Sequence, residues 1–125
     1  MSLSTEPHLS SPLSSLSFER FSPALGATVR GIDLSAPIAE QTRRSLRRGL
    51  LDHGVLFFRD QRLTPQQLLE FARIFGEPLR HNPYLPSHAE TSGVEIIESG
   101  TGSRLANEAW HADVTWQENP PKATA

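Results

Sequence analysis

The sequence predicts an α+β fold, mainly β, in which a few short strands accompany two helices. Three observations lead to this prediction. Short runs of strand character are separated by proline and glycine, and two longer segments repeat their apolar residues at helical spacing. The chain then returns to an extended segment near its end. Its 125 residues suffice for one ordinary domain or for part of a larger one.

The first 17 residues are predicted to form a disordered tail. Serine occupies seven of these positions, two prolines interrupt the segment, and no apolar run is present. Structure is expected to begin at Phe18, so that residues 18–125 form the folded part.

Two strands and a helix are expected first. Residues 18–21 and 27–32 have strand character, and residues 39–53 are predicted to form a helix with Leu46 and Leu50 on one face. Gly54 lies where a glycine commonly ends a helix. Residues 55–58 are wholly apolar, which favours a strand that is buried on both faces.

The polar residues of the first helix have a simple interpretation. Its four arginines could suggest a phosphate or nucleic-acid site, but the net charge of −2 favours a solvated face. These arginines are Arg43, Arg44, Arg47 and Arg48. His53, at the end of the helix, is expected to cap it or to complement its dipole.

The second helix has the clearest start signal in the chain. Thr64 is a typical N-cap, Pro65 suits the first helical position, and Gln67 completes a capping box. Apolar residues continue at helical spacing as far as Phe75, and Gly76 is expected to close the element.

The remaining segments are assigned more coarsely. The stretch from Glu77 to Ser92 is expected to form a loop, because Pro78, Pro83 and Pro86 disfavour regular pairing. We then expect a strand over 94–98, a polar loop over 99–106 and an extended segment over 110–116.

Composition excludes several classes of function. The chain contains no cysteine, which rules out disulfides, thiolate metal sites and cysteine nucleophiles. The slightly acidic charge gives no reason to expect a nucleic-acid or membrane partner, and no stretch resembles a signal peptide or a membrane span. We therefore expect a cytoplasmic protein.

His111 and Asp113 are the strongest candidates for chemistry. They lie two positions apart on a segment predicted to be extended, so both side chains can bind one metal ion from the same side. An imidazole and a carboxylate suit Fe(II), whereas a structural zinc site would favour thiolates. On the triplet alone, a turn histidine beside a solvated aspartate remains the alternative.

Several ordered blocks occur along the chain. They are Gly31-Ile32-Asp33-Leu34, residues 53–61 (HGVLFFRDQ), 63–67 (LTPQQ), 75–77 (FGE) and 107–116 (NEAWHADVTW), and Pro120-Pro121. Together these blocks resemble the taurine dioxygenase family of Fe(II)- and 2-oxoglutarate-dependent oxygenases, and the resemblance extends from about Phe18 to the last residue.

The resemblance implies a fold and a reaction. The chain would be the N-terminal part of a double-stranded β-helix, or jelly roll, with two flanking helices and an incomplete roll. His111 and Asp113 would be the first two ligands of a 2-His-1-carboxylate iron site. With 2-oxoglutarate as cosubstrate and dioxygen, the complete protein would hydroxylate a small organic anion and release succinate and CO2.

The resemblance also implies a substrate site. His81, Tyr84 and Asn107 match positions that lie near the sulfonate in taurine-using members, and Val114 matches a residue that lines the same pocket. Such donors suit a sulfonate such as taurine. Members of the family also act on alkyl sulfates and aryloxyacetates. From composition alone, His81 and Tyr84 would be ordinary loop residues.

The family pattern includes groups that this chain does not contain. The second metal-binding histidine and the arginine that pairs with 2-oxoglutarate would lie downstream, so the 125-residue chain is expected to be inactive by itself. One alternative is a non-catalytic metal-binding or interaction module. Another is a zinc-dependent hydrolase that uses His81 as a further ligand. The sequence leaves the oligomeric state open, a homo-oligomer included.

Overall fold

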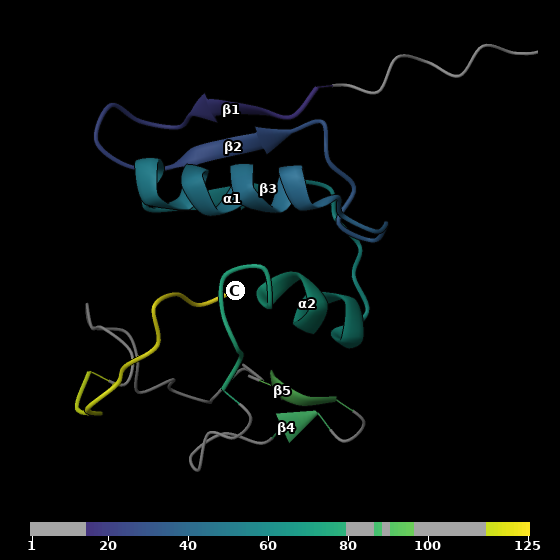
Figure 1. Ribbon diagram of the computed structural model, residues 1–125, viewed down its shortest axis with the longest axis vertical. Coiled ribbons are helices and arrows are strands. Elements are labelled where there is room, and N and C mark those ends of the chain that lie inside the picture. The colour runs from purple at the N-terminus through teal and green to yellow at the C-terminus, as the bar shows by residue number, and fades with distance from the viewer. Residues whose placement is uncertain (1–14, 80–86, 89–90, 97–114) are drawn as a thin grey trace, which may run out of the picture.

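The computed structural model describes residues 15–79, 87–88, 91–96 and 115–125. A three-stranded sheet lies beside one helix, and a second helix lies next to a small hairpin (Figure 1). The elements, in chain order, are β1 (Ser17–Arg20), β2 (Ala27–Arg30), α1 (Glu40–His53), β3 (Leu56–Phe58), α2 (Pro65–Ala72), β4 (Ser87–His88) and β5 (Thr91–Glu95).

The larger sheet has the strand order β1-β2-β3. β1 and β2 are antiparallel, with Phe18 opposite Val29, whereas β2 and β3 are parallel, with Val29 opposite Phe58. Parallel strands need a crossover connection, and α1 provides it. Because side chains alternate along a strand, these three residues share the face that α1 covers.

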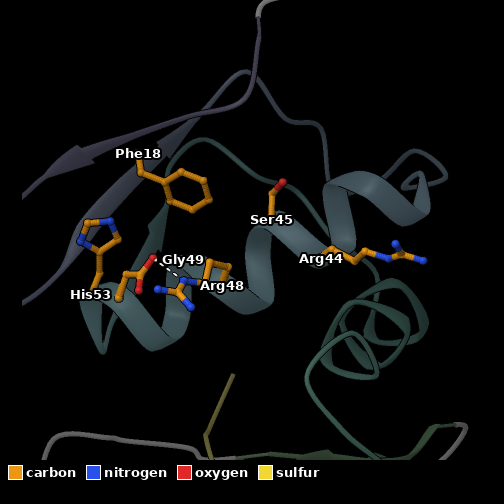
Figure 2. Close-up of a pocket in the computed structure, with 7 residues that line it drawn as sticks. Phe18, Arg44, Ser45, Arg48, Gly49 and His53 are labelled. Carbon is orange, nitrogen blue, oxygen red and sulfur yellow. Dashed lines mark hydrogen bonds and ion pairs between the residues drawn. The ribbon is translucent and has the colours of Figure 1, made fainter.

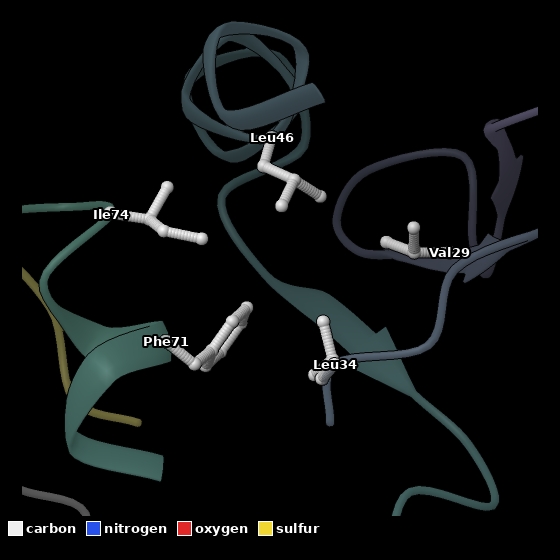
Figure 3. Close-up of a cluster of buried hydrophobic side chains, with 5 residues drawn as sticks. All are labelled: Val29, Leu34, Leu46, Phe71 and Ile74. Atoms are coloured by element: carbon white, nitrogen blue, oxygen red, sulfur yellow. The ribbon is translucent and has the colours of Figure 1, made fainter. Parts of the chain in front are cut away.

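The core lies between this sheet face and the two helices. Its buried residues come from distant parts of the chain, as Figure 3 shows. They are Val29, Leu34, Leu46, Phe71 and Ile74. Phe71 also makes edge-on ring contacts with Phe58 and Phe75, at centroid distances of 5.0 and 5.5 Å. One core therefore joins the sheet, α1 and α2.

The predicted α+β class is confirmed, and the early elements lie where expected, except that β1 ends at Arg20 instead of residue 21 and β2 ends at Arg30 instead of residue 32. β1 begins at Ser17, one residue before the predicted start, and residues 1–14 lie outside the described part of the chain. Ala39 is the N-cap of α1, and Gly54 ends the helix with a positive φ of 71°. The Gly54 N–H donates to the Leu50 carbonyl at 2.8 Å, as a glycine at this position permits.

The arginines of α1 are only partly a solvated face. Arg44 and Arg48 are three-quarters exposed, as expected. Arg47 instead donates from Nε to the Ile74 carbonyl at 2.6 Å, and Arg43 donates to the Ile38 carbonyl at 2.9 Å. Their long side chains let the guanidinium groups reach carbonyls that the helix itself cannot satisfy. Arg47 thereby ties α1 to the turn after α2.

The expectation that residues 55–58 are buried on both faces is wrong. β3 is half-buried throughout, and Val55, just before it, is 37% exposed. The reason is that α1 covers one face only, and within the described residues β3 pairs with β2 alone. Phe57 lies on the other face, where it contacts Phe21 at 5.0 Å and the Arg59 guanidinium at 5.3 Å.

The start of α2 is confirmed in detail, and its end is not. Thr64 and Gln67 form the capping box, with Pro65 in the first turn. The helix ends at Ala72 instead of continuing through Phe75. Tighter i→i+3 bonds follow, from Ile74 N–H to Phe71 and from Phe75 N–H to Ala72. This turn buries Ile74 and leaves its carbonyl to Arg47.

Two loops at the ends of the parallel strands are joined by one amide. The Leu34 N–H donates to Gln61 Oε1 at 2.9 Å, and Gln61 Nε2 donates to the Arg59 carbonyl at 3.0 Å. The blocks at 31–34 and 59–61 are therefore brought together by a side chain. These two blocks thus connect the loops that follow β2 and β3.

The predicted loop through Ser92 and the strand over 94–98 need correction. Residues 87–88 and 91–95 pair as an antiparallel hairpin with an irregularity at Ser87 and His88. All three prolines that disfavour pairing precede Ser87, so none prevents this ladder. Residues 97 and 98 lie outside the described residues.

Residues 115–119 form turns and bends, so the predicted extended segment does not continue through Thr115 and Trp116. Among the described residues no strand pairs with this segment, which leaves no ladder to hold it extended. Trp116 is 69% exposed. No described helix has both the length and the apolar character that a membrane crossing requires.

Candidate functional site

The six predicted site residues occupy two segments that the structure does not describe. His81 and Tyr84 fall within 80–86, and the rest fall within 97–114. The latter are Asn107, His111, Asp113 and Val114. Whether these side chains meet stays a prediction. The structure does describe the residues from which both segments start.

The β4–β5 hairpin connects these two segments. Leu79 precedes 80–86 and Ser87 follows it, while Ile96 precedes 97–114. Ser87 lies opposite Glu95 in the hairpin register. The exit from the first segment and the entry to the second therefore lie at the same end of the hairpin.

The hairpin is positioned by α2. β5 packs on this helix, and Thr91 is buried at 7% exposure. Figure 1 shows the hairpin on the side of α2 that faces away from the larger sheet. α2 thus lies between the main core and the hairpin. Its capping box and its buried Phe71 hold it in that place.

Gly93 is a residue that the sequence interpretation missed. It lies within β5 and has a φ of +97°, and a side chain there would approach α2. The available signal was an isolated glycine beside a strand-like run, a pattern that often indicates close backbone approach.

A depression of about 400 Å³ lies on α1, away from the hairpin (Figure 2). Its lining residues are Phe18, Arg44, Ser45, Arg48, Gly49, Asp52 and His53. Arg48 pairs with Asp52 at 2.9 Å, and Arg44 pairs with Glu40 at 3.2 Å. The two arginines already have carboxylate partners. We therefore interpret the depression as a packing gap between β1 and α1, and not as a binding site.

His53 does not cap α1 through its side chain. Its ring stacks on Phe18 with centroids 5.9 Å apart, and its Nδ1 atom is buried without a hydrogen-bond partner in the described part of the structure. Figure 2 shows the two rings side by side. The backbone N–H of Gly54 provides the cap instead, so packing against β1 determines the orientation of His53.

Two carboxylates have pKa values below their ordinary range. Hydrogen bonds from the Ser35 hydroxyl and backbone lower the pKa of Asp33. A hydrogen bond from Arg44 lowers the pKa of Glu40, with a further contribution from the charge of Arg47. Both carboxylates are exposed, so these shifts reflect surface hydrogen bonds at Asp33 and a surface ion pair at Glu40.

No cluster of three or more histidine, cysteine, aspartate or glutamate side chains suited to a metal occurs among the described residues. The donor chemistry of the sequence nevertheless fits Fe(II). His111 provides an imidazole nitrogen, Asp113 provides carboxylate oxygens, and the chain has no thiolate to favour zinc.

Comparison with known protein families gives one match that covers most of the chain. Residues 17–125 match the family described as "Taurine catabolism dioxygenase TauD, TfdA family". This range contains every candidate site residue and every block on which the resemblance was based.

Individual proteins agree with this match. The chain is 35% identical over 115 residues to an alkylsulfatase of Acinetobacter baylyi, and 38% identical over 101 residues to an α-ketoglutarate-dependent sulfate ester dioxygenase of Pseudomonas putida. These alignments cover 91% and 80% of this chain, but 35% and 33% of the relatives. The chain thus spans about a third of the length of the curated relatives that it matches.

A solved structure is similar in fold to part of this chain. The crystal structure of a taurine dioxygenase from Burkholderia xenovorans has a TM-score of 0.57 and 32% sequence identity. The alignment covers 63% of this chain and 28% of that chain.

Proposed function

Since the chain belongs to the taurine catabolism dioxygenase TauD, TfdA family, we propose that the complete protein is an Fe(II)- and 2-oxoglutarate-dependent dioxygenase. The observation that carries the proposal is the match over residues 17–125, which includes the His111 and Asp113 pair. The jelly roll, of which these elements would form the beginning, is part of the same proposal.

In this proposal His111 and Asp113 hold the iron. When bound, iron with 2-oxoglutarate and dioxygen supplies an oxidation that hydroxylates the substrate and releases succinate and CO2. The His111 imidazole and the Asp113 carboxylate would bind the iron together, and the bound iron would supply the centre at which 2-oxoglutarate and dioxygen react. The second histidine ligand and the 2-oxoglutarate-binding arginine would come from sequence beyond this chain.

The proposed substrate is a small organic anion with a sulfonate or sulfate-ester group. His81, Tyr84 and Asn107 would donate hydrogen bonds to its oxygens, and Val114 would contact its apolar part. The names of the two curated relatives and of the solved neighbour support this choice, because sulfate esters and taurine share the –SO3⁻ group. Aryloxyalkanoates are the second class to test.

The direct test is succinate release by the complete protein with Fe(II) and 2-oxoglutarate. We expect release with taurine or an alkyl sulfate, and less with an aryloxyacetate. His111→Ala should reduce it by more than about 100-fold, since a missing metal ligand removes the reaction centre. His8→Ala, outside the family match, is the matched control and should leave the rate unchanged.

Several results would contradict the proposal. Succinate release that survives His111→Ala would exclude this residue as an iron ligand. Substrate conversion without dioxygen and 2-oxoglutarate would favour a zinc hydrolase instead. The 125-residue chain alone should show no turnover, because two of the groups that the family pattern uses are missing from it. Turnover by that chain would disprove this part of the proposal.

A further inference from the structure

We infer that the face of the larger sheet opposite α1 is the docking surface for the part of the complete protein that lies beyond this chain. The surface consists of four apolar side chains, which we call the open-face patch. They are Phe21, Leu25, Val55 and Phe57. The inference rests on the proposed function in one respect, because it takes the complete protein to be about as long as its relatives.

The four side chains form one surface. The rings of Phe21 and Phe57 lie 5.0 Å apart, and Val55 lies two positions before Phe57, on the same face. Leu25 covers Gly54, the residue before Val55, since a Cβ atom there would lie 2.6 Å from Leu25 Cδ1. Phe21 is 63% exposed and Leu25 is 54% exposed. A contiguous exposed apolar surface commonly indicates an interaction site.

Backbone hydrogen bonds hold the patch in place. The Phe21 N–H donates to the Gly26 carbonyl at 2.9 Å and closes the turn between β1 and β2. The Gly26 N–H donates to the His53 carbonyl at 2.8 Å, and the Ala27 N–H donates to the Val55 carbonyl at 2.9 Å. The two turns that present the patch are therefore joined through their backbones. A surface that is ordered before contact loses less conformational entropy on docking than a mobile one.

The two edge strands of the sheet differ in a way that supports docking at β3. β1 carries Glu19, which pairs with Arg30 of β2 at 3.1 Å. Charged side chains of this kind commonly protect an edge strand from further pairing. β3 consists of one leucine and two phenylalanines and carries no charge. Its composition suits a strand inside a sheet, covered on both faces, better than an edge that faces water.

The length of the relatives favours the same polypeptide over a second copy as the occupant. The chain spans about a third of the curated relatives that it matches. Because larger proteins bury a larger share of their surface, this third is expected to expose apolar groups that the remainder covers. A stable interface between copies takes roughly 20–30 residues a side, many more than the patch provides. A contact within one polypeptide needs less area, since the covalent connection already holds its parts together.

The first experiment compares hydroxyl-radical footprinting of the 125-residue chain and of the complete protein. Phe21 should be oxidised about fivefold more slowly in the complete protein, because its exposed fraction would fall from 63% to that of the core of an interface. Phe71, a buried residue of the same type, is the matched control and should be protected in both proteins. The measurement needs no activity and no substrate.

The second experiment compares the melting temperatures of variants at Phe21. In the complete protein Phe21→Ser should lower the melting temperature by more than about 5 °C, because a buried aromatic side chain is lost. In the 125-residue chain the loss should stay below about 3 °C, since this side chain is mostly exposed there. Phe21→Leu is the conservative control, and in the complete protein it should lower the melting temperature less than Phe21→Ser.

A concentration series identifies the occupant. Protection of Phe21 by the rest of the same polypeptide does not depend on protein concentration, whereas protection by a second copy increases with it. Protection that increases with concentration would overturn the inference in favour of an interface between copies. Equal oxidation of Phe21 in the two proteins would also overturn it, as would equal losses of melting temperature in Phe21→Ser.

These outcomes are separate from the test of the proposed function. A complete protein that releases no succinate contradicts the proposed function alone. Slow oxidation of Phe21 at every concentration of that protein would still support the docking surface.

Discussion

The frame of residues 15–79 and the β4–β5 hairpin are held in place by different means. The frame has its own hydrophobic core, to which β2, α1, α2 and the loops around them contribute. In the hairpin, Thr91 is the buried residue among those whose burial is described, and β5 depends on contact with α2. The frame is stabilised by its own core, whereas the hairpin is held by its contact with α2.

This difference separates stability from function. Substitutions in the frame core should change the free energy of unfolding and leave the proposed substrate site alone. Substitutions at the contact between the hairpin and α2 should cost less stability, because Thr91 is the buried residue there among those whose burial is described. The following predictions test how the frame is stabilised from within, beginning with the largest expected effect.

Leu46→Ala should be the most destabilising change. Leu46 is fully buried between α1 and the sheet, so the substitution should cost about 2–5 kcal/mol through lost burial and the resulting cavity. Denaturant unfolding measures this cost. Leu51→Ala, on the same helix at 80% exposure, should change the stability by less than about 0.5 kcal/mol. Equal losses of stability in both variants would show that burial of Leu46 does not stabilise the frame.

Gly49→Ala should destabilise the frame by about 1–2 kcal/mol. The overlap with the Phe18 ring favours the upper part of the usual overpacking cost of about 1–3 kcal/mol, and improved helix propensity returns about 1 kcal/mol. The melting temperature measures the net effect. Phe18→Leu in the Gly49→Ala background should recover part of the loss. If it lowers the stability further, the two residues do not compete for the same space.

Gln61→Ala should cost about 1–2 kcal/mol, because the Leu34 N–H and the Arg59 carbonyl both lose a partner. Gln66→Ala is the matched control, since its amide donates to Glu70 on the exposed side of α2. Thermal unfolding of the two variants compares them directly. A larger loss in Gln66→Ala would show that the loops of the frame do not depend on this amide.

The pH dependence of the Glu40 pairing should be the smallest effect. Its pKa is lowered in the folded state, so the pairing stabilises the protein above the ordinary glutamate pKa of about 4.3. This contribution is lost as the pH falls through the lower folded-state pKa. Melting temperatures of the parent chain and Glu40→Gln should therefore differ near neutral pH and converge in acid. A difference that grows in acid would contradict the pairing with Arg44.

Local signals predicted the ends of elements that have their capping residues close by in the sequence. Thr64 and Gln67 bond to each other's backbone within one turn, and Gly54 adopts the positive φ that ends α1. Leu46 follows from helical spacing alone. Such features involve residues three or four positions apart, so a single sequence reveals them without knowledge of the fold.

The errors have a common physical origin in contacts between distant residues. The turn that follows α2 is bonded to Arg47, which lies 27 positions from Ile74. The partial burial of β3 depends on which face α1 covers. The sequence suggested a loop where the hairpin forms. In the hairpin Ser87 lies opposite Glu95, and β5 packs on α2. None of these partners can be identified from local periodicity.

The sequence by itself determined the family, the candidate donors and the main elements of the frame, because residue type and short spacing specify them. The metal pair His111 and Asp113 and the four substrate residues stay predictions on that basis. Only the tertiary structure decided that α2 supports the hairpin and that Gly93 of β5 lies close to Leu69 of α2 and to Leu79. Those properties arise from packing between elements, which chain order does not reveal.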